Sequence, residues 1–200
     1  GYEVMKDLHV RMQEARNEMP NYGELYGGGD SLYWFMSYDE GKCYDEIKEE
    51  TLSQICAVAL ATARAVEKYH KIGYLHLDIK PENIFVLSQT KDYIKLIDFD
   101  NVVRKEELGD ESILIGCSKE TSALEVRADK RSRISEASDY YSIGAMVFGR
   151  IFKRGIHFNE SKYAARYDFG GLLEEYGDKK KELENELSSF FKHTICDFMK

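Results

Sequence analysis

The spacing of apolar residues predicts helices at both ends of the first seventy positions and a hairpin between them. Residues 3–19 read as a helix that stops before Pro20. Residues 24–36 are rich in aromatics around Gly27-Gly28-Gly29, which predicts two strands joined by a glycine turn. The glycines lack the G-x-G-x-x-G spacing of a phosphate loop, and no helix follows, so the turn is the favoured interpretation.

A second helix is predicted directly after Thr51, where Thr51-Leu52-Ser53-Gln54 forms a capping-box pattern. Apolar residues then recur at steps of three and four up to Val66, and Gly73 ends the helix. A third helix is expected from about residue 139 to Gly155, and an apolar stripe over 183–198 predicts another core helix. Residues 98–125, which lie between the second and third predicted helices, are polar and are interpreted as a long functional loop.

The chemistry is concentrated in residues 74–100. The order His76-x-Asp78-x-Lys80-Pro81-Glu82-Asn83 is followed, after a short hairpin pattern, by Asp98-Phe99-Asp100. A transferring phosphoryl group carries spread negative charge and needs positioning, and a carboxylate, a lysine and two hard oxygen ligands for Mg²⁺ supply that. Asp78 or Asn83 alone would be interpreted as the cap of a turn, but eight positions in register favour a phosphoryl-transfer site.

This order resembles the catalytic loop and the D-F-G segment of the eukaryotic-type serine/threonine protein kinase family. The resemblance implies that Asp78 is the catalytic base and that Lys80 contacts the transferred phosphate. It implies that Asn83 and Asp98 bind Mg²⁺, and that ATP and Mg²⁺ are the cofactors. In the family, His76 would pack beneath the segment that contains Phe99.

The nucleotide side of the site is implied by weaker matches. Met36, Ser37 and Tyr38 resemble the hinge whose backbone bonds adenine, and Phe85 matches the residue that packs beneath it. For the helix-C glutamate, Glu14 is preferred to Glu18 on spacing. A plain core role for Met36 and Phe85, and a solvated position for Glu14, are the alternatives.

The substrate side is implied by the segment that resembles the family's A-P-E stretch, with Leu124 in place of proline. Ser118 would bridge the catalytic aspartate and lysine, Glu125 would anchor the substrate floor, and Glu82 would face a basic residue of the substrate. Asp139 opens a D-x-x-S-x-G pattern and would bind backbone amides of the catalytic loop. Its alternative is a charge partner at a helix start.

Two departures from the family pattern affect regulation. Leu77 stands where the family has an arginine that pairs with a phosphorylated loop, so switching by that route is not expected. Asp100 replaces a glycine and narrows the backbone choices there, although aspartate is among the more tolerant substitutes. We expect metal binding by Asp98 to survive and movement of the segment to be damped.

The family's glycine-rich loop and strand lysine have no match in their usual place. Lys6 lies only eight residues before Glu14, too close for a usual helix C. We therefore expect a segment of a longer kinase, weak or inactive in isolation. The predicted fold is α+β and protein-kinase-like, with a mostly helical large lobe and a truncated small β lobe. Residues 1–38 would form a partial N-lobe with helix C, hairpin and hinge, and residues 39–200 the C-lobe.

Composition narrows the function further. The net charge of −8, from 28 basic and 36 acidic residues, argues against nucleic acid as the main partner. Four widely spaced cysteines favour reduced thiols and a cytoplasmic location over zinc or disulfides. No apolar run is long enough to predict a membrane span, and the oligomeric state stays open.

Together these features predict a Ser/Thr kinase that transfers the ATP γ-phosphate to a protein hydroxyl. One alternative is a small-molecule kinase of the aminoglycoside or choline type, which Asp98-Phe99-Asp100 also resembles. Another is a pseudokinase or scaffold without catalysis, favoured by the missing nucleotide loop and the changes at Leu77 and Asp100. The intact Asp78, Lys80, Asn83 and Asp98 oppose that alternative.

Overall fold

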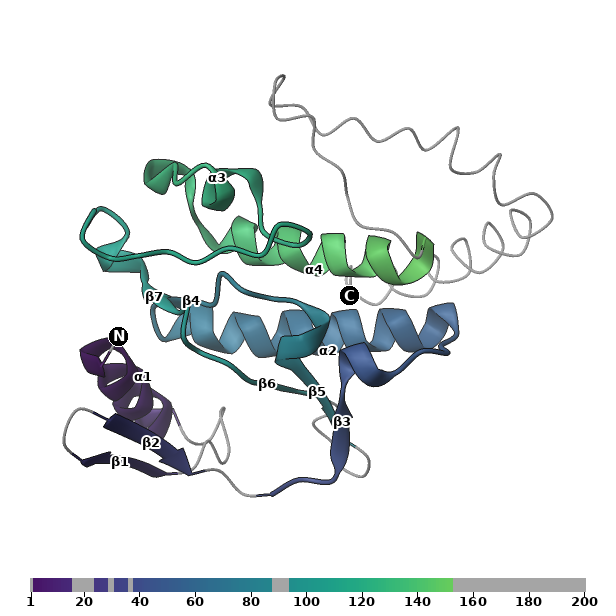
Figure 1. Cartoon of the computed structure of the whole chain (residues 1–200), viewed down its shortest axis with the longest axis horizontal. Coiled ribbons are helices and arrows are strands. Elements are labelled where there is room, and N and C mark those ends of the chain that lie inside the picture. Colours follow the sequence, from purple (N-terminus) through teal and green to yellow (C-terminus); the bar gives the residue numbers. More distant parts are fainter. Residues whose placement is uncertain (1, 16–23, 29–30, 36–37, 88–93, 153–200) are drawn as a thin grey trace, which may run out of the picture.

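The computed structural model describes residues 2–15, 24–28, 31–35, 38–87 and 94–152 (Figure 1). The α-helices are α1 (Tyr2–Glu14), α2 (Leu52–Lys71), α3 (Leu124–Arg127) and α4 (Glu136–Phe152). The strands are β1 (Glu24–Gly28), β2 (Ser31–Phe35), β3 (Gly41–Cys43), β4 (Tyr74–Leu75), β5 (Ile84–Leu87), β6 (Ile94–Leu96) and β7 (Val103–Arg104). Short 3-10 helices cover Tyr44–Glu46, Pro81–Asn83, Lys105–Glu107 and Arg131–Arg133. The predicted α+β class is confirmed.

Helix α2 begins and ends where the sequence predicts. The Thr51 side chain accepts a bond from the Gln54 amide at 3.3 Å, and the Gln54 side chain accepts one from the Thr51 amide at 2.8 Å. This reciprocal pair is the predicted capping box, and it satisfies two amides that the helix leaves open. Gly73 follows the helix with φ of +92°, a conformation that glycine adopts without steric cost.

The described strands form three small antiparallel sheets, in the orders β1-β2, β3-β5-β6 and β4-β7. The β1-β2 pair is the predicted hairpin, with Tyr26 opposite Tyr33. The β5-β6 pair is the hairpin expected between the catalytic motif and Asp98. Strand β5 is the central strand of its sheet and pairs with β3 on one side and with β6 on the other.

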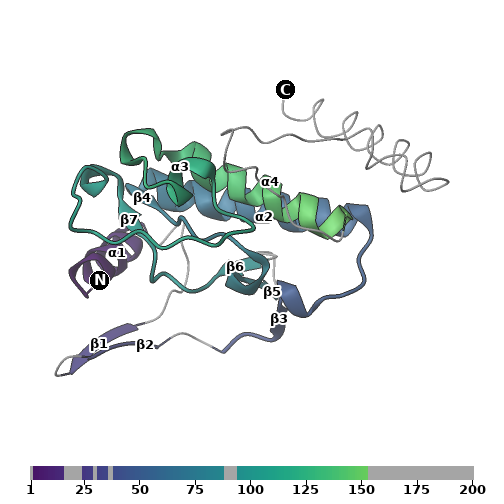
Figure 2. The same ribbon diagram turned by 45° about the horizontal axis from the view of Figure 1, so that its top comes forward.

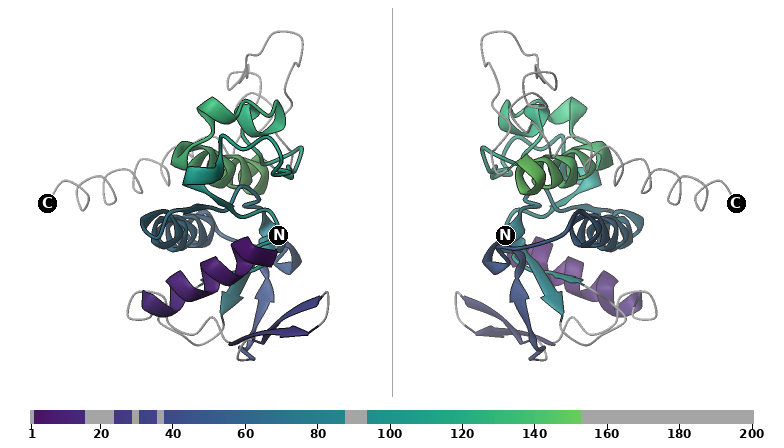
Figure 3. Two further views of the ribbon diagram at one scale, coloured as in Figure 1. Left: turned by 90° about the vertical axis from the view of Figure 1, so that its left-hand side faces the viewer. Right: turned by 90° about the vertical axis from the view of Figure 1, so that its right-hand side faces the viewer.

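Helix α2 lies between α4 on one side and the β3-β5-β6 sheet on the other (Figures 1 and 3). Its buried side chains include Val58, Val66 and Tyr69, which belong to the main core. The strand β4 follows directly from its C-terminal end, so the helix delivers the chain to the predicted catalytic loop. The fold thereby places residues 76–83 directly after a helix whose buried face belongs to the core.

One apolar core joins segments from both sides of the predicted lobe boundary at residues 38 and 39. Leu8 and Met12 of α1 belong to the same cluster as Val66 and Leu96. The lobe division stays a prediction, because α1 has no separate core of its own within the described residues.

Helix α1 is also held by charged contacts to the strands β4 and β7, which lie next to it (Figure 2). Asp7 accepts a hydrogen bond from the Tyr74 hydroxyl, and its carboxylate lies 3.1 Å from Arg104 Nε and 2.9 Å from Arg11 Nε. The Tyr74 hydroxyl and the two guanidinium groups outweigh burial and lower the pKa of Asp7. Burial, with the Asp7 carboxylate, raises the pKa of Tyr74 to about 12.

Several predicted features fall partly or wholly outside the described residues. Helix α1 ends at Glu14, and positions 16–19 of its predicted range are not described. The same holds for the end of the third helix near Gly155 and for the apolar stripe over 183–198. Among the helices of the described ranges, none has the length and hydropathy that crossing a bilayer requires.

Candidate active site

Asp78 is the centre of the polar contacts in the loop between β4 and β5. Its side chain is 4% exposed, and its Oδ2 accepts a hydrogen bond from Lys80 Nζ at 2.7 Å. Its Oδ1 accepts one from the Ser118 hydroxyl at 2.6 Å. Lys80 Nζ also lies 3.5 Å from Ser118 Oγ, so the three side chains form a triangle across residues far apart in sequence.

The negative charge of Asp78 and the positive charge of Lys80 stabilise each other. Burial acts to raise the pKa of Asp78, but hydrogen bonds from Lys80 and Ser118 outweigh it and hold the pKa below its ordinary value. Burial also disfavours the Lys80 cation, while the Asp78 carboxylate overcomes this and raises the Lys80 pKa. Asp78 is therefore ionised and Lys80 protonated at neutral pH.

Asn83 and Asp98, the predicted metal ligands, are positioned by one backbone hydrogen bond. The Ile97 amide donates to the Asn83 carbonyl at 3.0 Å, which brings the end of β6 to the start of β5. The Asn83 amide nitrogen donates to the Asp78 carbonyl at 2.9 Å, so its side-chain oxygen is turned away from that bond. Asp98 is exposed. An amide oxygen and an accessible carboxylate fit Mg²⁺, which binds few protein ligands beside substrate phosphates.

The backbone restriction expected at Asp100 lies two residues earlier. Asp98 has φ of +62°, whereas Asp100 is not among the residues with positive φ. The Asp98 carboxylate accepts a hydrogen bond from the Asp100 amide at 3.4 Å. Aspartate is one of the side chains that tolerate the left-handed region, because it bonds locally to the backbone. The replacement of glycine by Asp100 therefore imposes no strain in this conformation.

His76 and Phe99 lie in contact beneath the loop. Their ring centroids are 5.5 Å apart, and the ring centroid of Tyr69 in α2 lies 5.4 Å from that of Phe99. Burial lowers the pKa of His76, so the imidazole is neutral at pH 7. Within the described residues neither of its ring nitrogens has a hydrogen-bond partner, which agrees with a packing role.

Asp139 reaches from α4 to the backbone of the predicted catalytic loop. Its carboxylate is fully buried and accepts hydrogen bonds from the amides of His76 at 3.0 Å and Leu77 at 2.7 Å. The Nε2 of His70, at the end of α2, lies 2.8 Å from the same carboxylate. Asp139 thus joins two helices and the loop that carries Asp78.

The other predicted substrate-side residues take separate positions. Glu125 is half-buried and accepts a hydrogen bond from the Ser138 hydroxyl at 2.7 Å. Glu82 is exposed in the 3-10 helix that follows Lys80. Neither side chain contacts Asp78 directly.

The predicted nucleotide side stays a prediction, because the structure describes only part of it. Met36 and Ser37 lie outside the described residues, and Tyr38 is 93% exposed. Phe85 is partly buried on β5, opposite Cys43 and Lys95. Glu14 is exposed at the end of α1, and within the described ranges the ion pairs of this helix are made by other side chains.

Sequence reasoning missed two groups of residues that position the site. The first is Asp7 with Tyr74 and Arg104, which connects α1 to the strands around the catalytic loop. The second is Asn101, whose amide nitrogen donates to Asp78 Oδ2 at 3.2 Å. Its only signal was its place directly after Asp98-Phe99-Asp100, which by itself indicates no contact.

Leu77, where the family has arginine, is an apolar anchor for the segment that follows Asp98. It is 1% exposed and packs in a second cluster with Leu75, Val103, Ala123 and Val126. It has φ of +60°, a strained conformation for a leucine. The loop and the segment over 103–126 are therefore held together by apolar burial.

We expect Leu77→Ala to lower the free energy of unfolding by about 2–5 kcal/mol, because it leaves a cavity in this cluster. Urea unfolding measures the change. Leu114→Ala is the matched control, since Leu114 is 92% exposed and its loss is expected to cost less than about 0.5 kcal/mol. Equal effects of the two substitutions would contradict the anchoring role.

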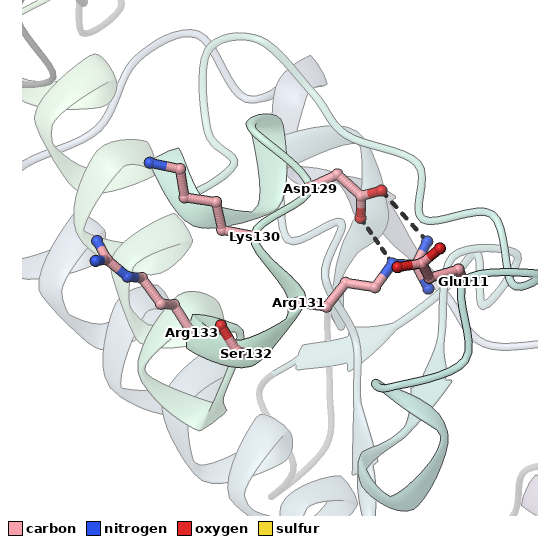
Figure 4. A pocket seen from close by; sticks show the side chains of 6 residues that line it. All are labelled: Glu111, Asp129, Lys130, Arg131, Ser132 and Arg133. Atoms are coloured by element: carbon pink, nitrogen blue, oxygen red, sulfur yellow. Dashed lines mark hydrogen bonds and ion pairs between the residues drawn. The ribbon is translucent and has the colours of Figure 1, made fainter.

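A polar cavity of about 650 Å³ lies beside the turn after α3, lined by Glu111, Asp129, Lys130, Arg131, Ser132 and Arg133 (Figure 4). Arg131 points toward Glu111 and Asp129, while Lys130 and Arg133 point to the other side. The Arg131 guanidinium donates to the carbonyls of Asp110 and Ile113 and pairs with Asp129 at 3.0 Å. These contacts use the hydrogen-bond donors of Arg131 within the protein. We therefore interpret Arg131 as a residue that holds the segment over 110–113 in place.

Comparison with known proteins agrees with this geometry. The family model of the protein kinase domain matches residues 9–200, and the chain belongs to that family. This confirms the protein-kinase-like fold predicted from the catalytic motif.

The curated relatives are protein kinases of much greater length. The chain is 33% identical over 152 residues to the smooth-muscle myosin light chain kinase of Gallus gallus, covering 72% of this chain and 7% of the relative. It is 23% identical over 201 residues to the serine/threonine-protein kinase MRCK alpha of Mus musculus, covering 94% and 11%. With MRCK gamma of Homo sapiens the identity is 26% over 158 residues, covering 77% and 9%. The chain thus spans about a tenth of the length of these relatives.

Proposed function

We propose that the chain carries the catalytic centre of a protein kinase that transfers the ATP γ-phosphate to a serine or threonine hydroxyl of a protein. The observation that carries this proposal is the triangle of Asp78, Lys80 and Ser118, because an ionised carboxylate and a protonated amine meet there at 2.7 Å. The serine/threonine specificity is supported by the Lys80-Pro81-Glu82-Asn83 order and by the names of the relatives.

In this proposal Asp78 orients the attacking hydroxyl and accepts its proton, and the oxygen of that hydroxyl displaces ADP from the γ-phosphorus. Lys80, charged at neutral pH, stabilises the negative charge on the transferring group as a point charge. Ser118 holds the Asp78 carboxylate at one oxygen and keeps its rotation fixed. These residues position the attacking hydroxyl and stabilise the charge on the transferring phosphoryl group, which are the two effects that phosphoryl transfer requires.

Asn83 and Asp98 would hold Mg²⁺, which would neutralise charge on the phosphates of bound ATP. Asn83 is fixed for this by its bonds to the Asp78 carbonyl and carboxylate. The hinge at Met36, Ser37 and Tyr38, the adenine contact of Phe85 and the helix-C role of Glu14 stay predictions. The same is true of the lobe division at residue 38 and of the cytoplasmic location.

The test is transfer of labelled γ-phosphate from Mg-ATP, using the protein at its natural length. The acceptors are a generic protein substrate, the protein itself, and an aminoglycoside and choline as small-molecule acceptors. We expect label on protein serine or threonine. Label on the small molecules alone would show a small-molecule kinase instead. If no acceptor is labelled, whether or not ATP binds, the proposal would be replaced by a scaffold without catalysis.

A further inference from the structure

Asp78 receives hydrogen bonds from four side chains, and they are divided unequally between its two oxygens. Lys80 Nζ, Asn83 Nδ2 and Asn101 Nδ2 donate to Oδ2, at 2.7, 3.1 and 3.2 Å. Among the residues that the structure describes, only the Ser118 hydroxyl donates to Oδ1, at 2.6 Å. A carboxylate oxygen has about two lone-pair sites, so Oδ2 is saturated while Oδ1 keeps the capacity to accept another proton.

Asn101 is held in this position by the close approach of another backbone segment. A Cβ at Gly116 would lie 2.0 Å from Asn101 Oδ1 and 2.7 Å from its Cγ, far inside contact distance. The Asn101 carboxamide therefore lies directly against the glycine, and any larger residue at position 116 would displace it. Gly116 is required here for space.

The same short stretch of chain thus acts on both oxygens of Asp78. Ser118 reaches Oδ1 directly, and Gly116, two residues earlier, supports the Asn101 amide that donates to Oδ2. Asn101 also differs from the other donors to Oδ2, because it lies outside the H-x-D-x-K-P-E-N order; like Asn83, and unlike Lys80, it carries no charge. It can fix the carboxylate through a hydrogen bond that adds no further charge beside Asp78 and Lys80.

We propose that Asn101 is a positioning residue for Asp78: braced by Gly116, it saturates Oδ2 and leaves Oδ1 as the atom that accepts the substrate proton. This inference rests on the proposed kinase function. It makes the orientation of the Asp78 carboxylate depend on the position of residues 116–118. If that stretch moves away, Oδ1 loses the bond from Ser118 and Asn101 loses the support of Gly116.

The test compares Asn101→Leu, Gly116→Ala and Ser112→Ala in steady-state phosphate transfer to a protein substrate. Leucine matches the shape of asparagine but cannot donate, so Asn101→Leu removes the bond and keeps the volume. We expect kcat to fall about tenfold, as for the loss of a hydrogen bond to a charged group, while the KM for ATP stays within about twofold. Gly116→Ala should lower kcat similarly by pushing the amide aside.

Ser112→Ala is the matched control, because the hydrogen bonds of Ser112 within the described ranges go to the exposed Asp110 in the same segment. It should leave kcat unchanged. If Asn101 merely fills space, Asn101→Leu will keep the wild-type kcat, and that result would overturn the inference while the kinase function stands. A wild-type protein without any transfer would instead overturn the proposed function, and the positioning role with it.

Discussion

Asp78→Asn is expected to lower kcat by about 10²- to 10⁴-fold, the usual contribution of a positioned general base. The substitution keeps the size of the side chain and an oxygen that can accept from Ser118. It removes the negative charge that faces Lys80 Nζ at 2.7 Å and the site that accepts the substrate proton. Steady-state transfer of labelled phosphate, with ATP binding measured separately, checks this expectation.

Asp110→Asn is the matched control for this experiment, because Asp110 is an exposed aspartate in the same region and contacts none of the predicted catalytic residues. It should keep the wild-type kcat. The role of Asp78 would be refuted if both variants retained activity, or if Asp78→Asn lost only ATP affinity. A loss confined to Asp78→Asn would assign the base.

The sequence predicted the parts of this site that depend on local order. His76, Asp78, Lys80 and Asn83 lie within eight positions, so their spacing alone places them on one loop, and the hairpin that follows delivers Asp98 beside them. The capping box of Thr51 and Gln54 and the turn at Gly73 are equally local, and both were found where they were predicted.

The parts that the sequence did not predict depend on contacts between distant segments. Asn101 reaches Asp78 over 23 positions, and its place is decided by how closely Gly116 approaches it. Asp7 and Tyr74 are 67 positions apart. Neither hydrophobic periodicity nor a local motif predicts such pairs, because each residue taken alone is an ordinary polar side chain.

The location of the backbone strain is a further instance of this limit. A glycine-to-aspartate change predicted restriction at Asp100, but the left-handed conformations near the site lie at Leu77 and Asp98, and a third lies at Asp129 after α3. Leu77 is held there by its buried cluster and by the bond from its amide to Asp139. Tertiary contacts, which a residue type does not reveal, decide which position carries the strain.

Asp139→Asn should therefore have the largest effect on stability, lowering the free energy of unfolding by about 3–5 kcal/mol. The buried carboxylate accepts from the amides of His76 and Leu77 and contacts His70 Nε2, so either orientation of an asparagine turns an N–H₂ group toward a group already bonded there. At least one buried backbone amide then loses its acceptor.

The measurement is urea unfolding together with hydrogen exchange at the amides of His76 and Leu77. Asp129→Asn is the control, because Asp129 is an exposed aspartate paired with Arg131, and surface pairs contribute at most about 1 kcal/mol. If Asp139 anchors the loop, exchange at both amides accelerates in Asp139→Asn and not in Asp129→Asn. Equal stability of the two variants would mean that the loop carrying Asp78 is held by apolar packing around Leu77 alone.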